Sequence, residues 1–297
     1  MDSLALGLVL VSAVMHATWN ILLKTAGDPL RTSTVAMLAG TAVLVPAAAV
    51  GWLVLGRPDL PAKAWAIGCV SGLAEIAYFV FLSSAYRRGD LSVVAPIARG
   101  TAPALIVAVG VLVLGERLAG PAAAGVALLL AGLLTVQRPW RFLRAAHSAH
   151  RGAAGFALLT GLMIATYTSL DSVGSQLAPP WLYMAILWTV TAAGLGLIDV
   201  VRPRLAGGGF AARPGSLSVR TAATAGMLTL AAYALVLFAL SRSDVALVGP
   251  LRESSVLITA TYGIVKLREA VTRREMALRL GGSALVILGA AVLAIAG

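Results

Sequence analysis

Long apolar runs separated by short polar connections fill this chain almost from end to end. A helix that crosses the hydrocarbon core of a bilayer needs about 20 predominantly apolar residues. The pattern therefore predicts ten spanning helices, near residues 3–23, 32–55, 64–86, 91–114, 119–137, 153–173, 180–201, 219–240, 245–267 and 277–296. These spans leave no stretch long enough for a separate soluble domain.

One stretch occurs twice. Residues 89–99 have a counterpart in residues 243–253, which places Pro250 over Pro96. In each copy the proline lies about two turns into a membrane-length helix and frees the carbonyl group four residues back. Free backbone groups at membrane depth are tolerated only where they face protein or a water-filled cavity. A doubled, proline-interrupted segment therefore points to the central site of a transporter.

Further matches extend the repeat over the whole chain. Met15-His-Ala-Thr-Trp-Asn20 corresponds to Met163-Ile-Ala-Thr-Tyr-Thr168, and Gly125 and Gly132 correspond to Gly282 and Gly289. Five spans in each copy is an odd number, so the second copy must insert upside down. We therefore predict an all-α integral membrane protein of two inverted five-helix repeats. The glycine positions allow close helix packing, either within the chain or in a dimer contact.

The predicted division of the chain follows from this repeat. The first repeat comprises residues 1–138 and the second residues 152–297, and a basic linker loop covers residues 139–151.

Composition agrees with a membrane protein, because 59% of the residues are hydrophobic and only 12% are charged, against about 25% in soluble domains. The single cysteine, Cys69, excludes a disulfide framework and a cysteine-rich metal site. The net charge of +11 lies in short loops, which argues for topology signals and against nucleic-acid binding. Phosphate-binding, zinc-protease and nucleophile-elbow motifs are absent, so we expect no enzyme activity, metal or cofactor.

The basic residues also predict an orientation. Those in loops after odd-numbered spans are Lys24, Arg31, Arg87, Arg88, Arg138, Arg141, Arg144, Arg151, Arg202, Arg204, Arg213, Lys266, Arg268, Arg273, Arg274 and Arg279. Those after even-numbered spans are Arg57, Lys63, Arg117 and Arg242. The positive-inside rule then makes the odd loops cytoplasmic and leaves both termini outside.

Polar residues at membrane depth supply the candidate site. In the first span Ser12, His16, Asn20 and Lys24 recur every four residues and share one face, which should line an interior surface. His16 and Asn20 either contact a ligand or form hydrogen bonds between helices. Lys24 is expected to extend toward the membrane interface.

The third span carries Ser71, Glu75 and Tyr78 on one face. A carboxylate near the middle of the bilayer costs about 2.5–3.5 kcal/mol on insertion scales. Glu75 is therefore either protonated or paired with a cation. The first state suits a proton carrier, and the second suits a contact to a substrate or a gate. The structural alternative is a static ion pair with Arg99.

Charged residues follow both prolines, with Arg99 aligned to Glu253 and Arg252 beside it. Opposite charges at repeat-related positions favour an ion pair between the halves, although these arginines could equally contact an anionic substrate group. Asp171 is a further candidate, near a helix end and open to water.

Aromatic residues complete the expected lining. Tyr167, Thr229 and Tyr233 are predicted to line the interior, whereas Trp19 and Trp188 are expected to pack or to face lipid.

These features resemble the drug/metabolite transporter superfamily, EamA type. The resemblance covers the whole chain and rests on two five-helix repeats and on the Ala95-Pro96 and Gly249-Pro250 positions. The helix ends at Gly115-Glu116 and Arg268-Glu269 add to it. It implies export of amino acids, metabolites or drugs, with import by some members. Well-described members keep both termini in the cytoplasm, and the charge distribution here predicts the opposite.

The leading hypothesis is a secondary transporter in the cell membrane that moves a small metabolite or drug-like solute by alternating access. It would use an ion gradient or the substrate gradient, with Glu75 as the candidate for proton coupling. Its partners would be a small-molecule substrate and the lipid bilayer, and it would be a monomer or a weak homodimer. The rival is a non-transporting membrane protein, either an intramembrane enzyme or a scaffold.

Overall fold

A computed structural model describes residues 3–24, 28–88, 91–118, 120–139, 151–205, 218–255, 257–258 and 272–296. These residues form helices and short connections, and no strand occurs among them. The helices described are α1 (Ser3–Lys24), α2 (Pro29–Val54), α3 (Ala62–Tyr86), α4 (Leu91–Leu112), α5 (Gly120–Gln137), α7 (Arg151–Leu177), α8 (Pro180–Leu205), α9 (Val219–Leu240), α10 (Val245–Arg252) and α12 (Arg273–Ala296).

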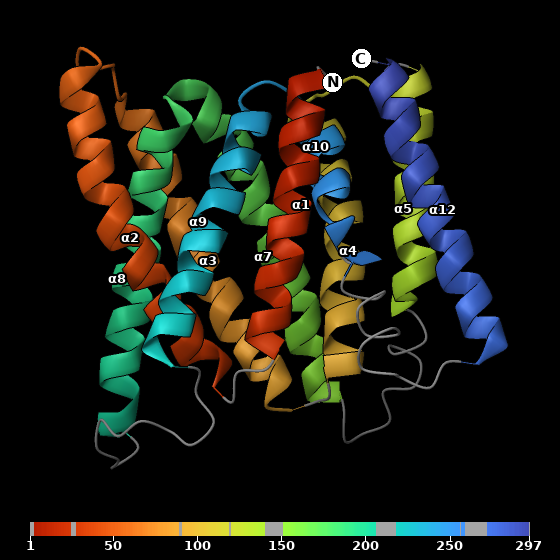
Figure 1. The fold of residues 1–297 in the computed structure, drawn as a ribbon, viewed down its shortest axis with the longest axis horizontal. Coiled ribbons are helices and arrows are strands. Elements are labelled where there is room, and N and C mark those ends of the chain that lie inside the picture. Colours follow the sequence, from red (N-terminus) through yellow and green to blue (C-terminus); the bar gives the residue numbers. More distant parts are fainter. Residues whose placement is uncertain are drawn as a thin grey trace.

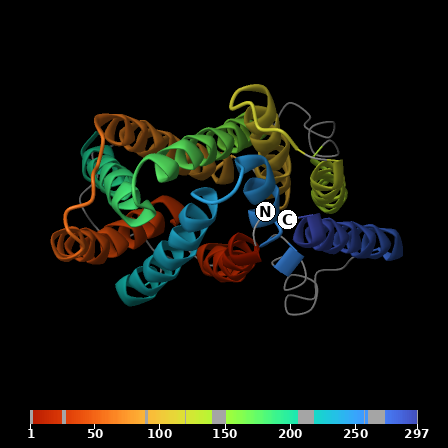
Figure 2. The ribbon, with the colours of Figure 1, turned by 90° about the horizontal axis from the view of Figure 1, so that it is seen from above.

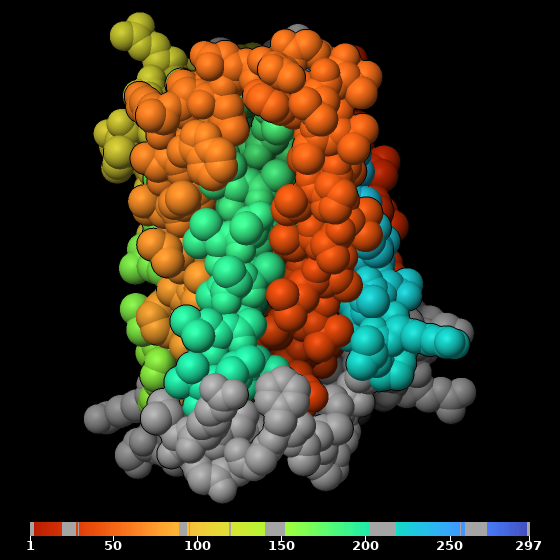
Figure 3. All heavy atoms as spheres, turned by 90° about the vertical axis from the view of Figure 1, so that its left-hand side faces the viewer, coloured from red at the N-terminus to blue at the C-terminus, as the bar shows by residue number. Residues whose placement is uncertain are grey.

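The outer surface identifies a membrane protein. Among the described residues, seven helices are long and apolar enough to cross a membrane, while the apolar segments Ser3–Trp19 in α1 and Pro96–Leu112 in α4 are shorter. Large apolar side chains are exposed along the outer faces, for example Val54 on α2 and Leu197 on α8. Figure 3 shows α8 between α2 and α3 on one such face. A continuous apolar exterior of this kind is suited to lipid.

The expected span over residues 245–267 is wrong as one continuous helix. Helix α10 ends at Arg252, and a turn at residues 253–254 comes next. Pro250 explains this ending, because its nitrogen carries no hydrogen for the carbonyl of Ala246 and its ring crowds that carbonyl. Pro96 and Pro103 are accommodated in α4, which continues to Leu112. Residues 259–271 lie outside the part of the chain that the structure describes.

The helices lie side by side, and the two chain ends lie at the same end of the molecule (Figure 1). The contacts between helices largely persist when the first five helices are exchanged for the last five. Helix α3 packs on α7 as α9 packs on α1, and α3 packs on α8 as α9 packs on α2. Likewise α4 contacts α7 as α10 contacts α1. The site residues at the centre are thus held by matching helices from both halves.

Helices α5 and α12 form a glycine-mediated antiparallel pair, seen side by side in Figure 2. A methyl group added at Gly132 would lie 2.6 Å from the carbonyl oxygen of Gly282, and one added at Gly282 would lie 2.9 Å from that of Gly132. Gly125 and Gly289 face each other in the same reciprocal way. The repeated glycines therefore pack within the chain, which decides between the two uses that the sequence left open.

Candidate functional site

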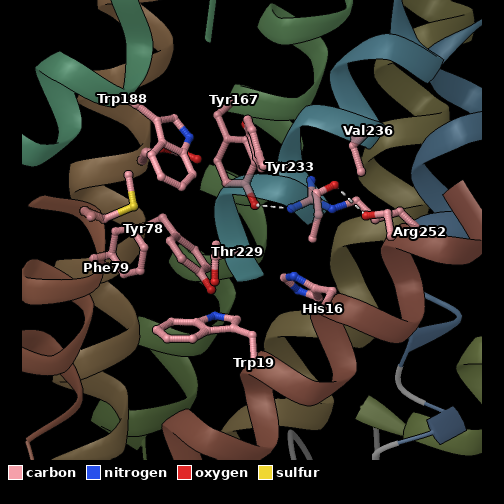
Figure 4. Close-up of a pocket in the computed structure, with 14 residues that line it drawn as sticks. His16, Trp19, Tyr78, Phe79, Tyr167, Trp188, Thr229, Tyr233, Val236 and Arg252 are labelled. Atoms are coloured by element: carbon pink, nitrogen blue, oxygen red, sulfur yellow. Dashed lines mark hydrogen bonds between the residues drawn. The ribbon is translucent and has the colours of Figure 1, made fainter. Parts of the chain in front are cut away.

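A small cavity of about 30 Å³ lies among the helices at the centre of the molecule, with room for a water molecule or two. Its walls come from both halves of the chain (Figure 4). The lining residues are Ser12, His16, Trp19, Met37, Glu75, Tyr78, Phe79, Tyr167, Trp188, Thr229, Ala232, Tyr233, Val236 and Arg252. Aromatic rings make up much of this wall, and one carboxylate and one guanidinium group interrupt it.

Glu75, on α3, is the carboxylate of the cavity and is buried. The Thr191 hydroxyl on α8 donates to its Oε2 atom over 3.0 Å. The same hydroxyl also lies 2.9 Å from the carbonyl oxygen of Leu187 and 3.3 Å from that of Gly72. A hydroxyl carries one proton and serves one of these acceptors at a time. Glu75 thus retains acceptor capacity toward the cavity.

Asp171, on α7, sits behind the cavity wall and joins four helices. Its Oδ1 atom accepts from the Ser71 hydroxyl on α3 at 2.5 Å and from the Tyr183 hydroxyl on α8 at 2.8 Å, and its Oδ2 atom accepts from the Tyr233 hydroxyl on α9. Only 1% of Asp171 is exposed. The expectation of a wet position near a helix end is therefore wrong, because α7 continues to Leu177. Asp171 holds Tyr233, which does line the cavity.

Arg252, the last residue of α10, points from the second half of the chain into the cavity (Figure 4). Its side chain donates to the Thr168 hydroxyl and the Tyr167 hydroxyl, both at 3.4 Å. The guanidinium carbon lies 5.7 Å from the ring centre of Tyr167 and 5.4 Å from that of Tyr233. No carboxylate among the described residues lies within 4.0 Å of this buried cation. Arg252 is thus held by neutral hydroxyls and aromatic faces.

The second arginine is paired instead. Arg99 on α4 lies 3.8 Å from Glu253, the residue that ends α10, as the repeat alignment suggested. The Arg99 guanidinium also lies 3.5 Å from Nε2 of His16. The alternative of a static Glu75–Arg99 pair finds no support among the described ion pairs. Of these three residues only His16 belongs to the cavity lining.

The aromatic wall connects the two halves. Tyr78 packs edge-on to Phe79 and Tyr167, with ring centres 4.8 and 5.9 Å apart. Trp19 and Trp188 also line the cavity, in addition to the packing role that the sequence suggested for them.

Several sequence predictions can be placed on this site. His16, Glu75, Tyr78, Tyr233 and Arg252 are brought together at the cavity, whereas Arg99, Glu253 and Asp171 lie behind its wall. Pro96 and Pro250 lie inside α4 and α10. Asn20 is helical, and its side chain lies outside what the structure describes.

Two participants were missed by sequence reasoning. Tyr183 and Thr191 both come from α8 and bind the two buried carboxylates. Tyr183 lies at the start of its helix, where an aromatic residue is expected at the membrane interface, and Thr191 is one of two threonines, with Thr189, in an otherwise apolar run. Neither position carries a signal in the sequence.

In the described part of the chain, no group of three or more His, Cys, Asp or Glu residues is placed to hold a metal ion. The arrangement instead offers one carboxylate, one cation and hydroxyl-bearing rings around a central space. Such a site can bind a small polar or charged solute, or exchange a proton with it.

Comparisons with known proteins agree with the fold. A solved crystal structure of a protein matches this chain with a TM-score of 0.74 and 20% sequence identity, and each chain is covered over 100% of its length. At this identity the likeness shows the fold alone. A search of curated proteins finds no match. Residues 3–137 match the model of the EamA-like transporter family, whose members are generally solute transporters. The resemblance drawn from the sequence is thereby confirmed over these residues.

Proposed function

We propose that the protein is a secondary transporter that moves a small metabolite or drug-like solute across the cell membrane by alternating access. The observation that carries the proposal is the central cavity, where Glu75 from the first half and Arg252 from the second reach the same space. Charged side chains at membrane depth are costly and mark substrate or ion pathways. A cavity of about 30 Å³ is too small for a metabolite, so loading it requires movement of the surrounding helices.

The proposed movement is a rocking of two inverted repeats, residues 1–138 and 152–297, joined by the linker 139–151. The exchangeable pattern of helix contacts supports this, as does the antiparallel pairing of α5 with α12. Ten spans are proposed, the ninth being interrupted after Arg252. In this scheme the basic odd-numbered loops face the cytoplasm, and both termini lie outside.

Each charged or polar residue of the site has a proposed role. Arg252 contacts an anionic group of the solute, because its buried guanidinium is held by neutral groups alone among the described residues. Glu75 carries a proton or contacts an amine of the solute, because the Thr191 hydroxyl that donates to it has two other acceptors in reach. Tyr78, Tyr233 and His16 orient the solute from the wall. The Arg99–Glu253 pair couples α4 to the end of α10.

The first test of this proposal is a comparison of metabolite levels in living cells. Metabolite levels inside and outside are compared between a strain that lacks the protein and one that overproduces it, and compounds that change in opposite directions are candidate substrates. Purified protein in proteoliposomes is then assayed with those compounds under an imposed proton gradient.

Variants connect the result to the cavity. Arg252→Gln and Glu75→Gln should abolish or strongly reduce uptake, whereas the exposed Arg274→Gln and Asp59→Asn keep wild-type rates. Unchanged metabolite levels in both strains, together with undiminished uptake by both cavity variants, would contradict the proposal.

A further inference from the structure

The first turn of α10 is capped by a residue from the other half of the chain. Glu116 lies in the connection between α4 and α5, and its carboxylate accepts two backbone hydrogen bonds. The donors are the N–H groups of Val245, at 2.8 Å, and Ala246, at 2.9 Å. A negative charge at a helix N-terminus satisfies exposed donors and complements the helix dipole.

The local sequence is built for this contact. Gly115 has a φ of +73°, a conformation that glycine adopts without strain. The turn it makes lets the Glu116 N–H bond back to the carbonyl oxygen of Gly110 at 3.0 Å. A side chain at Gly110 would collide with the Glu116 carboxylate. Glycines at both positions thus make room for the carboxylate and aim it at α10.

The residue that normally caps such a helix does not do so here. Asp244 occupies the N-cap position of α10, yet its side chain makes no capping hydrogen bond. Val245 and Ala246 are fully buried, and within the described chain the Glu116 carboxylate accepts from both of their N–H groups. Buried N–H groups are costly when unpaired. The start of α10 therefore depends on Glu116.

Helix α10 is fastened to the first half along its whole length. Gly249 leaves space for Ile106 of α4, since a methyl group added at Gly249 would lie 2.5 Å from the Ile106 Cγ2 atom. At the far end Glu253 pairs with Arg99. The eight residues of α10 are thus held at both ends, and Arg252 projects into the cavity from the last of them.

We infer that Glu116 is a positioning residue that fixes α10 on α4 and thereby sets the place of Arg252 in the cavity. The contact between Glu116 and the start of α10 is observed. Only its consequence for solute binding rests on the proposed function. Glu116 lies outside the cavity, and through the short helix α10 it determines where the Arg252 side chain lies within the cavity.

Hydrogen exchange measured by mass spectrometry tests the contact in the purified full-length protein. In Glu116→Ala, amide exchange across Val245–Arg252 should become roughly tenfold faster, as expected for losing a charged cap. Asp244→Ala is the matched control and should leave exchange in α10 unchanged, although an N-cap aspartate normally matters. Unchanged exchange in Glu116→Ala would overturn the contact. Faster exchange confined to the first two amides would overturn the positioning of Arg252.

A second measurement links the contact to the cavity. Benzoate, a flat carboxylate, is titrated against the fluorescence of the protein, because Trp19 and Trp188 line the cavity. Glu116→Ala should weaken benzoate binding about tenfold in the wild-type background and not at all in an Arg252→Gln background. Equal weakening in both backgrounds would overturn the action through Arg252. Absence of benzoate binding to the wild type would count against the proposed anion contact, while the exchange result would still decide the inference.

Discussion

Asp171→Asn is the sharpest probe of how the core of this protein is held together. The substitution keeps the size of the side chain, removes its charge and replaces one acceptor oxygen with an NH₂ donor. In the wild type three hydroxyl groups, from Ser71, Tyr183 and Tyr233, donate to the carboxylate. An asparagine oxygen can accept from two of them. The third hydroxyl then faces a donor in a position where Asp171 is 1% exposed.

The expected cost follows from these contacts. A hydrogen bond to a charged group contributes about 1.5–3 kcal/mol and a neutral one about 0.5–1.5 kcal/mol. Two bonds are therefore weakened by about 1–2 kcal/mol each, and one buried hydroxyl loses its acceptor at about 1–3 kcal/mol. Removing a buried charge offsets part of this sum. We expect a net loss of about 2–4 kcal/mol in the free energy of unfolding.

Reversible unfolding in detergent, followed by fluorescence, measures this loss. Tyr183→Phe removes one donor without touching the cavity lining, and the double variant with Asp171→Asn should lose less stability than the two single variants combined. Asp59→Asn, in an exposed loop, is the matched control. A loss below about 0.5 kcal/mol in Asp171→Asn, or additive losses in the double variant, would refute the hydrogen-bonded network.

Three further predictions combine unfolding in detergent with transport in proteoliposomes. Glu75→Gln keeps an acceptor for Thr191, so the free energy of unfolding should change by less than about 1.5 kcal/mol. The same variant should lose proton-driven transport, and a large loss of stability would contradict the coupling role. Gly132→Ala should destabilise by about 1–3 kcal/mol through the clash with α12, whereas Gly155→Ala, which has open space, should not. Burial raises the pKa of the Glu116 carboxyl, and the N–H groups of α10 offset this in part. The pH-dependent part of its contribution to stability is thus full below the usual glutamate pKa of about 4.3 and is lost as pH rises through the raised value. Glu116→Gln should abolish this dependence in unfolding measured across that range.

A fourth prediction concerns orientation. A reporter that is active only outside the cytoplasm should be active when fused after Gly297, and one that is active only in the cytoplasm should be active at Ala146. The opposite pair of results would reverse the orientation and leave the fold unchanged.

Much of the fold could be predicted because the length of a membrane helix is visible in the sequence as the length of an apolar run. The predicted span 219–240 coincides with α9, and the glycines of α5 and α12 show where two helices approach closely. The end of α10 after Arg252 could not be predicted, because Pro96 and Pro250 have similar sequence surroundings. The difference lies after each proline: α4 continues through Pro103, whereas α10 ends in a turn at Glu253.

The candidate site was predicted for the residues whose chemistry is unusual at membrane depth. Glu75, Arg252 and His16 stand out in apolar runs, since burying a charged or polar group at membrane depth is costly and usually serves a function. The partners of the buried carboxylates could not be found in this way. Thr191 and Tyr183 are ordinary residues in a membrane helix, and only the packing of α8 against α3 and α7 brings them to Glu75 and Asp171.

The two halves make corresponding helix contacts and differ in chemistry, and the chemical difference falls at the cavity. The spacing that relates Pro96 to Pro250 also relates Glu75 to Thr229, and both of these residues line the cavity. The acidic group is thus present on one side only, and Arg252, the cation of the cavity lining, comes from the other side. A solute that contacts both groups must bridge the two halves. In the proposed rocking motion the contacts of such a solute depend on the relative position of the two halves. Its binding free energy can therefore favour the closed arrangement over either open one.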